Sequence, residues 1–208
     1  MGLDTLIGFF VASVILALAP GPDNIFVMTH SMMRGREAGL AVVMGLCTGL
    51  LVHTTAVALG IAILFQTSDW AFTALKTVGA AYLLYLSWQA LTTSSVMDSN
   101  EADHQPSLFW SYRRGIIMNI TNPKVTLFFL AFLPQFIVEE SGQVTGQIIF
   151  LGALFIVATI VVFGTMALLA GRVSDFLRRS PLFEKNIHRL AGGIFIGLAG
   201  HLLLIEVG

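Results

Sequence analysis

Two short polar segments, each containing proline, interrupt otherwise apolar stretches of this chain. Residues 19–24 read Ala-Pro-Gly-Pro-Asp-Asn, and residues 119–124 read Asn-Ile-Thr-Asn-Pro-Lys. Together they supply one carboxylate, one ammonium group and three carboxamides, which can both donate and accept hydrogen bonds. A short site with one acid and one base suits an α-amino acid better than a sugar or a nucleotide. The candidate substrate-binding residues are Pro20, Gly21, Pro22, Asp23, Asn24, Asn119, Asn122, Pro123 and Lys124.

Asp23 carries the only carboxylate of the two segments. A carboxylate inside a bilayer costs roughly a few kcal/mol or more, so it is a functional candidate by default. Capping is the structural alternative, because the Pro-Gly-Pro run ends one half-helix and Asp23 or Asn24 would cap the next. The two roles are compatible, since the free amides of a half-helix N-terminus can bind a substrate carboxylate. A charged Asp23 would oppose that anion, so we expect it to bind the substrate's ammonium group or a proton.

Lys124 is the only Lys or Arg well inside an apolar block. It directly follows Pro123 at the expected start of a half-helix, where the helix dipole disfavours a cation. Asp23 is the natural compensating partner if the two breaks meet, and the alternative role of Lys124 is to hold the substrate's carboxylate. Snorkelling of the side chain to the cytoplasmic interface is the structural alternative.

His53 lies near the middle of another apolar stretch, with Thr48 close by. A lone histidine in a membrane is usually a hydrogen-bonded packing residue. The functional alternative is a proton relay, because histidine titrates near physiological pH, so His53 and Asp23 are the candidates for proton coupling. Thr48 and Gln135 are candidates for the transport pathway, Gln135 because Pro134-Gln135 marks a second kink. No second carboxylate or histidine lies at ligand spacing, so neither a metal nor a cofactor is expected.

The elements that carry these residues are membrane helices. Of the 208 residues, 56% are hydrophobic and 11% are charged, and the mean hydropathy is +0.84, whereas soluble domains are roughly 25% charged. The net charge of −1 argues against a nucleic-acid partner, and the single cysteine, Cys47, excludes an intrachain disulfide. Six blocks approach the ~20 residues that span a bilayer: residues 3–33 and 115–138, both interrupted, and residues 38–65, 70–91, 146–171 and 190–205.

Basic residues predict the orientation of these blocks. The connections after the first, third and fifth blocks hold nine Lys and Arg residues, and the opposite side holds only Lys76. Cytoplasmic loops are enriched in Lys and Arg, so we expect the basic connections in the cytoplasm and both termini outside. The nine residues are Arg34, Arg36, Arg113, Arg114, Arg172, Arg178, Arg179, Lys185 and Arg189.

The chain divides into two halves of three helices each within a single transmembrane domain. Residues 1–91 form the first half, residues 92–112 a cytoplasmic linker, and residues 113–208 the second half. Within the linker, the composition of residues 92–107 suits disorder. An odd number of helices per half gives the second half the opposite orientation. Paired breaks in the two halves are typical of a transport site near the midplane. We therefore predict an all-α integral membrane protein with six helices in a 3+3 inverted repeat, in which helices 1 and 4 are broken.

Five stretches of the chain resemble one family of transporters. They are residues 19–23 (Ala-Pro-Gly-Pro-Asp), 45–49 (Gly-Leu-Cys-Thr-Gly), 79–86 (Gly-Ala-Ala-Tyr-Leu-Leu-Tyr-Leu), 119–124 (Asn-Ile-Thr-Asn-Pro-Lys) and 132–136 (Phe-Leu-Pro-Gln-Phe). In this order they are similar to the lysine-exporter superfamily, in its homoserine/threonine-exporter (RhtB-type) branch. The resemblance implies a bacterial inner-membrane exporter of amino acids or close derivatives, driven by the proton gradient, with its site at the two proline motifs. The small size of such proteins is compatible with a homodimer.

These observations favour a secondary active amino-acid exporter that works by alternating access. A channel or passive facilitator for a small zwitterion or other solute is the alternative on the same scaffold, and the acid and base inside the membrane favour coupled transport over it. An intramembrane enzyme would need a nucleophile–base pair or a metal cluster, and the sequence shows neither. For an accessory subunit without transport activity, the paired helix breaks would be an unnecessary cost.

Overall fold

The computed structural model describes most of four predicted spans and fragments of the other two. Every element in the described part of the chain is helical. Pro20, Lys76, the linker residues 93–106 and the basic residues 172–185 lie outside the described residues. The described residues are 1–19, 21–67, 77–78, 80–81, 84–85, 87–88, 91–92, 107–138, 142–170, 189, 192–193, 196–197 and 199–200.

The described helices have defined bounds. In chain order they are α1 (Leu3–Leu18), α2 (Pro22–Arg34), α3 (Arg36–Thr67), α5 (Leu108–Thr121), α6 (Pro123–Leu127), the π-helical turn η1 (Phe128–Phe132), the 3-10 turn η2 (Leu133–Phe136) and α7 (Val144–Leu168).

Two of these helices, α3 and α7, are long and apolar enough to cross a membrane alone. Two further groups qualify only as bent units: α1 with α2, at an angle of 61°, and α5 with the segment from α6 to η2, at 51°. If each bent unit is one span, the described residues contain up to four spans. The chain is thus a multi-pass membrane protein, helical throughout its described part, and its bends fall at the two predicted breaks. The six-span 3+3 repeat stays a prediction.

The first break separates α1 from α2 at residues 19–21. Gly21 is extended (φ −173°, ψ 176°), and α2 begins at Pro22. Proline suits the first position of a helix, because its missing N–H would have no acceptor within the helix. The expected capping of α2 by Asp23 or Asn24 is wrong, since Gly21 occupies the cap position and both side chains lie in the first turn.

The second break lies between α5 and α6 at Asn122. Its backbone is extended (φ −77°, ψ 109°), and its carboxamide oxygen accepts a hydrogen bond from the amide of Lys124 at 2.9 Å. Asn122 therefore caps α6, as asparagine commonly does, and Pro123 takes the first helical position. Farther along, the second kink expected at Pro134-Gln135 is a change of helix type, from the π-helical turn η1 to the 3-10 turn η2.

The fourth predicted span begins earlier than expected. Its helix α5 starts at Leu108, because the hydroxyl oxygen of Ser107 accepts a hydrogen bond from the amide of Trp110 at 3.2 Å and caps the helix. The helix therefore reaches into the predicted connection, and the cytoplasmic linker over residues 92–112 stays a prediction. Arg113 and Arg114, which were expected in the connection, lie on α5.

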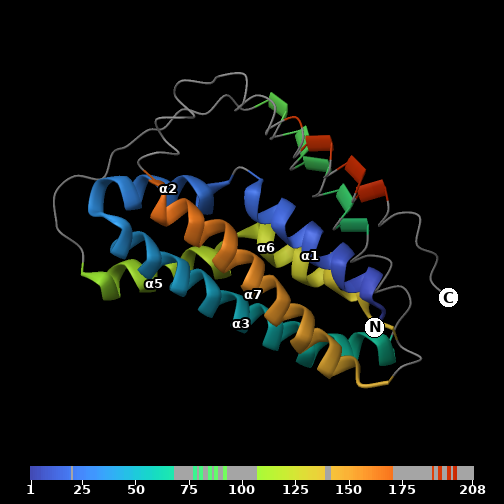
Figure 1. Ribbon diagram of the computed structural model, residues 1–208. Helices are drawn as coiled ribbons and strands as arrows, with labels where there is room; N and C mark the ends of the chain where they lie inside the picture. Colours follow the sequence, from blue (N-terminus) through green and yellow to red (C-terminus); the bar gives the residue numbers. More distant parts are fainter. Residues whose placement is uncertain are drawn as a thin grey trace.

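The helices lie side by side along a common direction, and the α1–α2 unit runs opposite to the α5–α6 unit (Figure 1). The end of α2 and the starts of α3 and α5 lie at the same end of the bundle. Four basic residues are therefore carried at this end: Arg34, Arg36, Arg113 and Arg114. It is the end that their charge predicts to face the cytoplasm.

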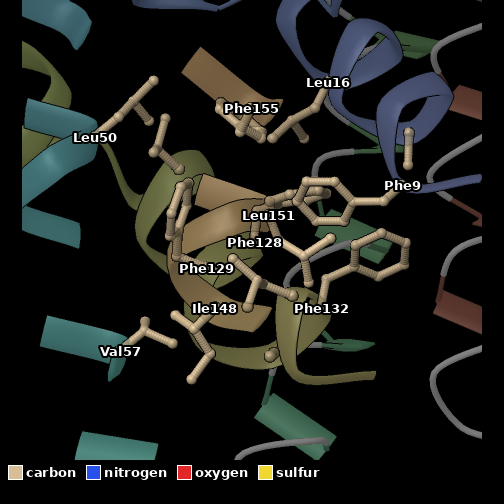
Figure 2. Close-up of a cluster of buried hydrophobic side chains, with 14 of the residues drawn as sticks. Phe9, Leu16, Leu50, Val57, Phe128, Phe129, Phe132, Ile148, Leu151 and Phe155 are labelled. Atoms are coloured by element: carbon tan, nitrogen blue, oxygen red, sulfur yellow. The ribbon is translucent and has the colours of Figure 1, made fainter. Parts of the chain in front are cut away.

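A cluster of phenylalanine side chains fills the core beyond the second break (Figure 2). Phe128, Phe129 and Phe132 belong to η1, and Phe155 of α7 contacts the first two with ring centroids 5.2 Å apart in each pair. Phe9 of α1 meets Phe128 at 5.9 Å. Tilted and edge-on ring pairs contribute roughly 0.5–1.5 kcal/mol beyond their burial. Packing against α1 and α7 therefore holds the segment beyond the break in place.

Glycines let α3 and α5 touch through their backbones. A Cβ atom on Gly45 would overlap the carbonyl oxygen of Tyr112 and the Cα atom of Gly115, and a Cβ atom on Gly49 would overlap the side chain of Asn119. Small residues allow such close approach in membranes, where lipid gives helices no hydrophobic drive to associate. The Gly45–Gly49 spacing therefore serves packing within the monomer.

We predict that Gly45→Ala destabilises the protein by about 1–3 kcal/mol, the usual cost of forcing extra atoms into a packed interface. Gly60→Ala on the same helix is the control, because a Cβ atom there would meet nothing within 4 Å. Both variants gain the same helix propensity, so their difference reports the contact with α5. Thermal unfolding in detergent, followed by circular dichroism, measures it, and equal midpoints would contradict the packing role of Gly45.

Candidate functional site

The two helix breaks lie against each other in the interior of the bundle. The carboxamide nitrogen of Asn122 donates to Asp23 Oδ2 at 2.6 Å. The ammonium group of Lys124 donates to the carbonyl oxygen of Ala19 at 3.0 Å. Asp23 is 2% exposed and Lys124 is 4% exposed. Polar groups within a membrane must find their partners inside the protein, and here each break supplies partners for the other.

Asn122 uses both ends of its carboxamide in this contact. Its oxygen caps α6 at the amide of Lys124, and its nitrogen donates to the carboxylate of Asp23. The two bonds fix the orientation of the amide, because a flipped amide would set its oxygen against the carboxylate and its nitrogen against an N–H group. The position of the Asp23 carboxylate is thus tied to the cap of α6.

The direct ion pair expected between Asp23 and Lys124 is wrong, since no ion pair joins them in the described structure and each bonds to a neutral group. The ammonium group lies at the C-terminal end of α1, where the helix dipole is negative and favours a cation. This contact offsets the unfavourable position of Lys124 at the N-terminal end of α6. The acid and the base therefore remain separate.

Several buried oxygen atoms near the breaks have no hydrogen-bond partner among the described residues. They include Asp23 Oδ1, Asn24 Oδ1, Asn119 Oδ1 and Thr159 Oγ1. The amide nitrogen of Asn24 is used, because it donates to the carbonyl of Ala17 at 2.7 Å and so holds the end of α1. An unpaired buried acceptor costs roughly 1–3 kcal/mol, so a group of them indicates a place where a hydrogen-bond donor binds.

A small cavity of about 10 Å³ lies between the helices at this point. It has room for about one water molecule, which is too little for an amino acid. Both the acid and the base border it, so its walls must move apart before a larger ligand can lie between them. The lining residues are Leu16, Ala17, Asp23, Leu46, Asn119, Lys124, Val125, Phe155, Thr159 and Phe163.

Three of the predicted residues act through the backbone. A Cβ atom on Gly21 would lie 3.0 Å from Lys124 Nζ, so glycine leaves room for the ammonium group. Pro22 and Pro123 each take the first position of a half-helix. They set where the helices restart and so where Asp23 and Lys124 lie.

The remaining predicted residues are not among those that line the cavity. His53 Nε2 lies 3.2 Å from the carbonyl oxygen of Asn119, in contact with the second break. Thr48 shares a hydrogen bond with the hydroxyl of Tyr112 at 3.0 Å, between α3 and α5. Gln135 donates to a carbonyl of the preceding turn at 2.7 Å. Of these, His53 has the most direct contact with the site.

The structure adds two polar residues that the sequence did not single out. Thr159 of α7 lines the cavity, and nothing in the apolar sequence of that helix sets it apart. His30 of α2 lies 2.9 Å from Ser111 Oγ of α5 and stacks on Phe26, with ring centroids 5.0 Å apart. A helix turns twice in about seven residues, so the spacing from Asp23 to His30 was a signal that both share one face.

We predict that Asn122→Ala lowers the free energy of unfolding by about 2–4 kcal/mol. It removes a helix cap, worth about 1 kcal/mol, and the donor to a buried carboxylate, worth about 1–3 kcal/mol. The control is Thr121→Ala, because Thr121 is exposed and its hydroxyl bonds only within α5; its effect should stay within about 0.5 kcal/mol. Unfolding in detergent measures both, and similar losses for the two variants would remove Asn122 from its bridging role.

Comparison with known proteins gives matches over nearly the whole chain. A family model described as "LysE type translocator" matches residues 14–206. The homoserine/homoserine lactone efflux proteins of Salmonella typhimurium and Salmonella typhi are each 34% identical over 203 residues, covering 98% of this chain and 97% of theirs. An uncharacterized membrane protein of Vibrio cholerae is 30% identical over 198 residues, 95% of each chain. No solved structure matches.

Proposed function

Because the chain belongs to the LysE family of translocators, we propose that it is a secondary active exporter of neutral amino acids or their close derivatives. The names of the two Salmonella relatives support a substrate of the homoserine or threonine kind. Membership of a translocator family is also consistent with transport rather than catalysis.

The observation that carries the proposal is the meeting of the two helix breaks at a cavity bordered by one acid and one base. An α-amino acid presents an ammonium group and a carboxylate. We assign the ammonium group to Asp23 Oδ1 and Asn119 Oδ1, which are acceptors without described partners. We assign the carboxylate to Lys124, whose ammonium group has three donors and one described acceptor, the carbonyl of Ala19.

Alternating access is the mechanism that this geometry supports. The cavity is too small for an amino acid, so binding requires the half-helices at the breaks to move apart. The contacts that close the site, from Asn122 to Asp23 and from Lys124 to Ala19, join the two predicted halves. Exchanging these contacts for bonds to the substrate would let helices rock around a fixed site, as in other transporters with broken helices.

Proton coupling and orientation complete the proposal. Asp23 borders the cavity, and His53 contacts the backbone of the second break, so protonation of either changes the hydrogen bonding of the site. We propose that both take part in coupling export to the proton gradient across a bacterial inner membrane. The basic end of the bundle would face the cytoplasm and both termini the periplasm.

We predict that Asp23→Asn lowers amino-acid counterflow at least about tenfold. A hydrogen bond to a charged group contributes about 1.5–3 kcal/mol, and tenfold corresponds to about 1.4 kcal/mol. The assay is counterflow of a panel of radiolabelled amino acids in proteoliposomes, with and without a pH gradient. Asp4→Asn, at an exposed position in the first turn of α1, is the matched control and should behave like the unmodified protein.

Each outcome of this assay has a separate meaning. Wild-type rate and pH dependence in Asp23→Asn would exclude Asp23 from substrate binding and coupling. Counterflow without any accumulation driven by a pH gradient would favour a passive facilitator on the same scaffold. No counterflow of any amino acid by folded wild-type protein would overturn amino-acid export and point to another solute.

A separate prediction concerns His53. His53→Gln keeps an N–H donor for the carbonyl of Asn119 but cannot titrate near neutral pH. We expect gradient-driven accumulation to fall several-fold in this variant, while counterflow, which needs no gradient, stays near the wild-type level. Both assays use the same proteoliposomes, so counterflow is the internal control for folding. Unchanged accumulation would leave His53 with a packing role only.

A further inference from the structure

The hydroxyl group of Thr159 is buried and lacks the backbone hydrogen bond that most other threonines in the described helices make. A helical threonine commonly donates to a carbonyl of the preceding turn, and Thr54 and Thr165 do so at 2.8 Å and 2.6 Å. Thr159 Oγ1 has no partner in the described part of the chain, although the residue is only 2% exposed. The same backbone bond is made by Thr29, Thr48, Thr55, Thr121 and Thr126.

Thr159 lies on the face of α7 that borders the cavity. Phe155, Thr159 and Phe163 follow at four-residue intervals, which puts them on one face of a helix, and all three line the cavity. Thr165 on the same helix is exposed and bonds to its own backbone. The wall that α7 contributes is thus apolar and aromatic except for one buried hydroxyl group.

The other polar groups of the cavity account for the ammonium and carboxylate groups of the substrate, so only its side chain remains to contact this wall. Asp23, Asn119 and Lys124 take the ammonium and carboxylate groups in the function proposed above, on which this step rests. The side chain of the amino acid then meets α7. We propose that Thr159 forms a hydrogen bond with that side chain and favours short side chains that carry a hydroxyl group over apolar side chains of the same size.

The chemistry of the wall explains this preference. A charged side chain would enter an apolar wall with no opposite charge, which is costly. An apolar side chain would leave the hydroxyl of Thr159 unpaired in the bound state, whereas a hydroxyl group can both donate to it and accept from it. A site that hydrogen-bonds a substrate hydroxyl rejects the analogue without one far better than an apolar pocket rejects an added hydroxyl.

The test compares homoserine with norvaline, in which a methyl group replaces the hydroxyl group, as competitors in the counterflow assay. We expect the wild-type protein to prefer homoserine by about tenfold, the upper range for one net hydrogen bond. Thr159→Val keeps the branched shape without the hydroxyl and should reduce the preference to about twofold or less, while norvaline is still transported. Thr159→Ser should retain the preference.

Two further variants make the test decisive. Thr165→Val removes a hydroxyl from the same helix away from the cavity and should leave the preference unchanged. Thr159→Ala repeats the deletion if the valine variant does not fold. A wild-type protein that transports amino acids without discriminating the two, or an unchanged preference without the Thr159 hydroxyl, would overturn the assignment and leave the proposed export intact. Equal loss of both substrates would also overturn it. No transport by the wild-type protein would instead overturn the export itself.

Discussion

The hydrogen bond from Asn122 to Asp23 is the interaction on which the rest of the site depends. Each broken helix exposes polar backbone and side-chain groups that lipid cannot satisfy, so neither break is tolerable in isolation. Asn122 resolves both problems with one carboxamide, because its oxygen closes the end of α6 while its nitrogen binds the carboxylate on α2. The backbone of one half thus determines where the charge of the other half lies.

The separation of the two charges follows from this arrangement. Asp23 is bound by a neutral amide, and Lys124 by the carbonyl at the end of α1. The two charges attract each other without direct contact in the described structure, so a ligand that carries both signs can form a direct interaction with each. A direct ion pair would have to be broken before such a ligand could bind. Binding by dipoles holds the charges in place and leaves them available to a zwitterion.

Local signals account for what could be predicted from the sequence. Proline, glycine and charge inside apolar blocks identified both breaks, and Asp23, Asn122 and Lys124 do lie together. The cap at Gly21 was a missed local signal, because proline at position 22 favours a helix that begins there. The bond from Lys124 to the end of α1 could not be foreseen, because it depends on which groups the other half presents. Thr159 was unpredictable for another reason. In an apolar helix a threonine looks the same whether its hydroxyl bonds to its own backbone or faces a cavity.

The backbone contact between α3 and α5 has a consequence for how the molecule can move. α3 comes from the first predicted half and α5 from the second, yet Gly45 and Gly115 place no side chain between them that could adjust to a displacement. The two helices therefore form one closely packed unit that crosses the boundary between the predicted halves. In the proposed exporter, movement would fall to the segments that pivot on the extended residues Gly21 and Asn122 once their packing contacts are released. Opening of the site would then be a swing about these two hinges against α3 and α5, and the boundary between moving and fixed parts would run through each predicted half.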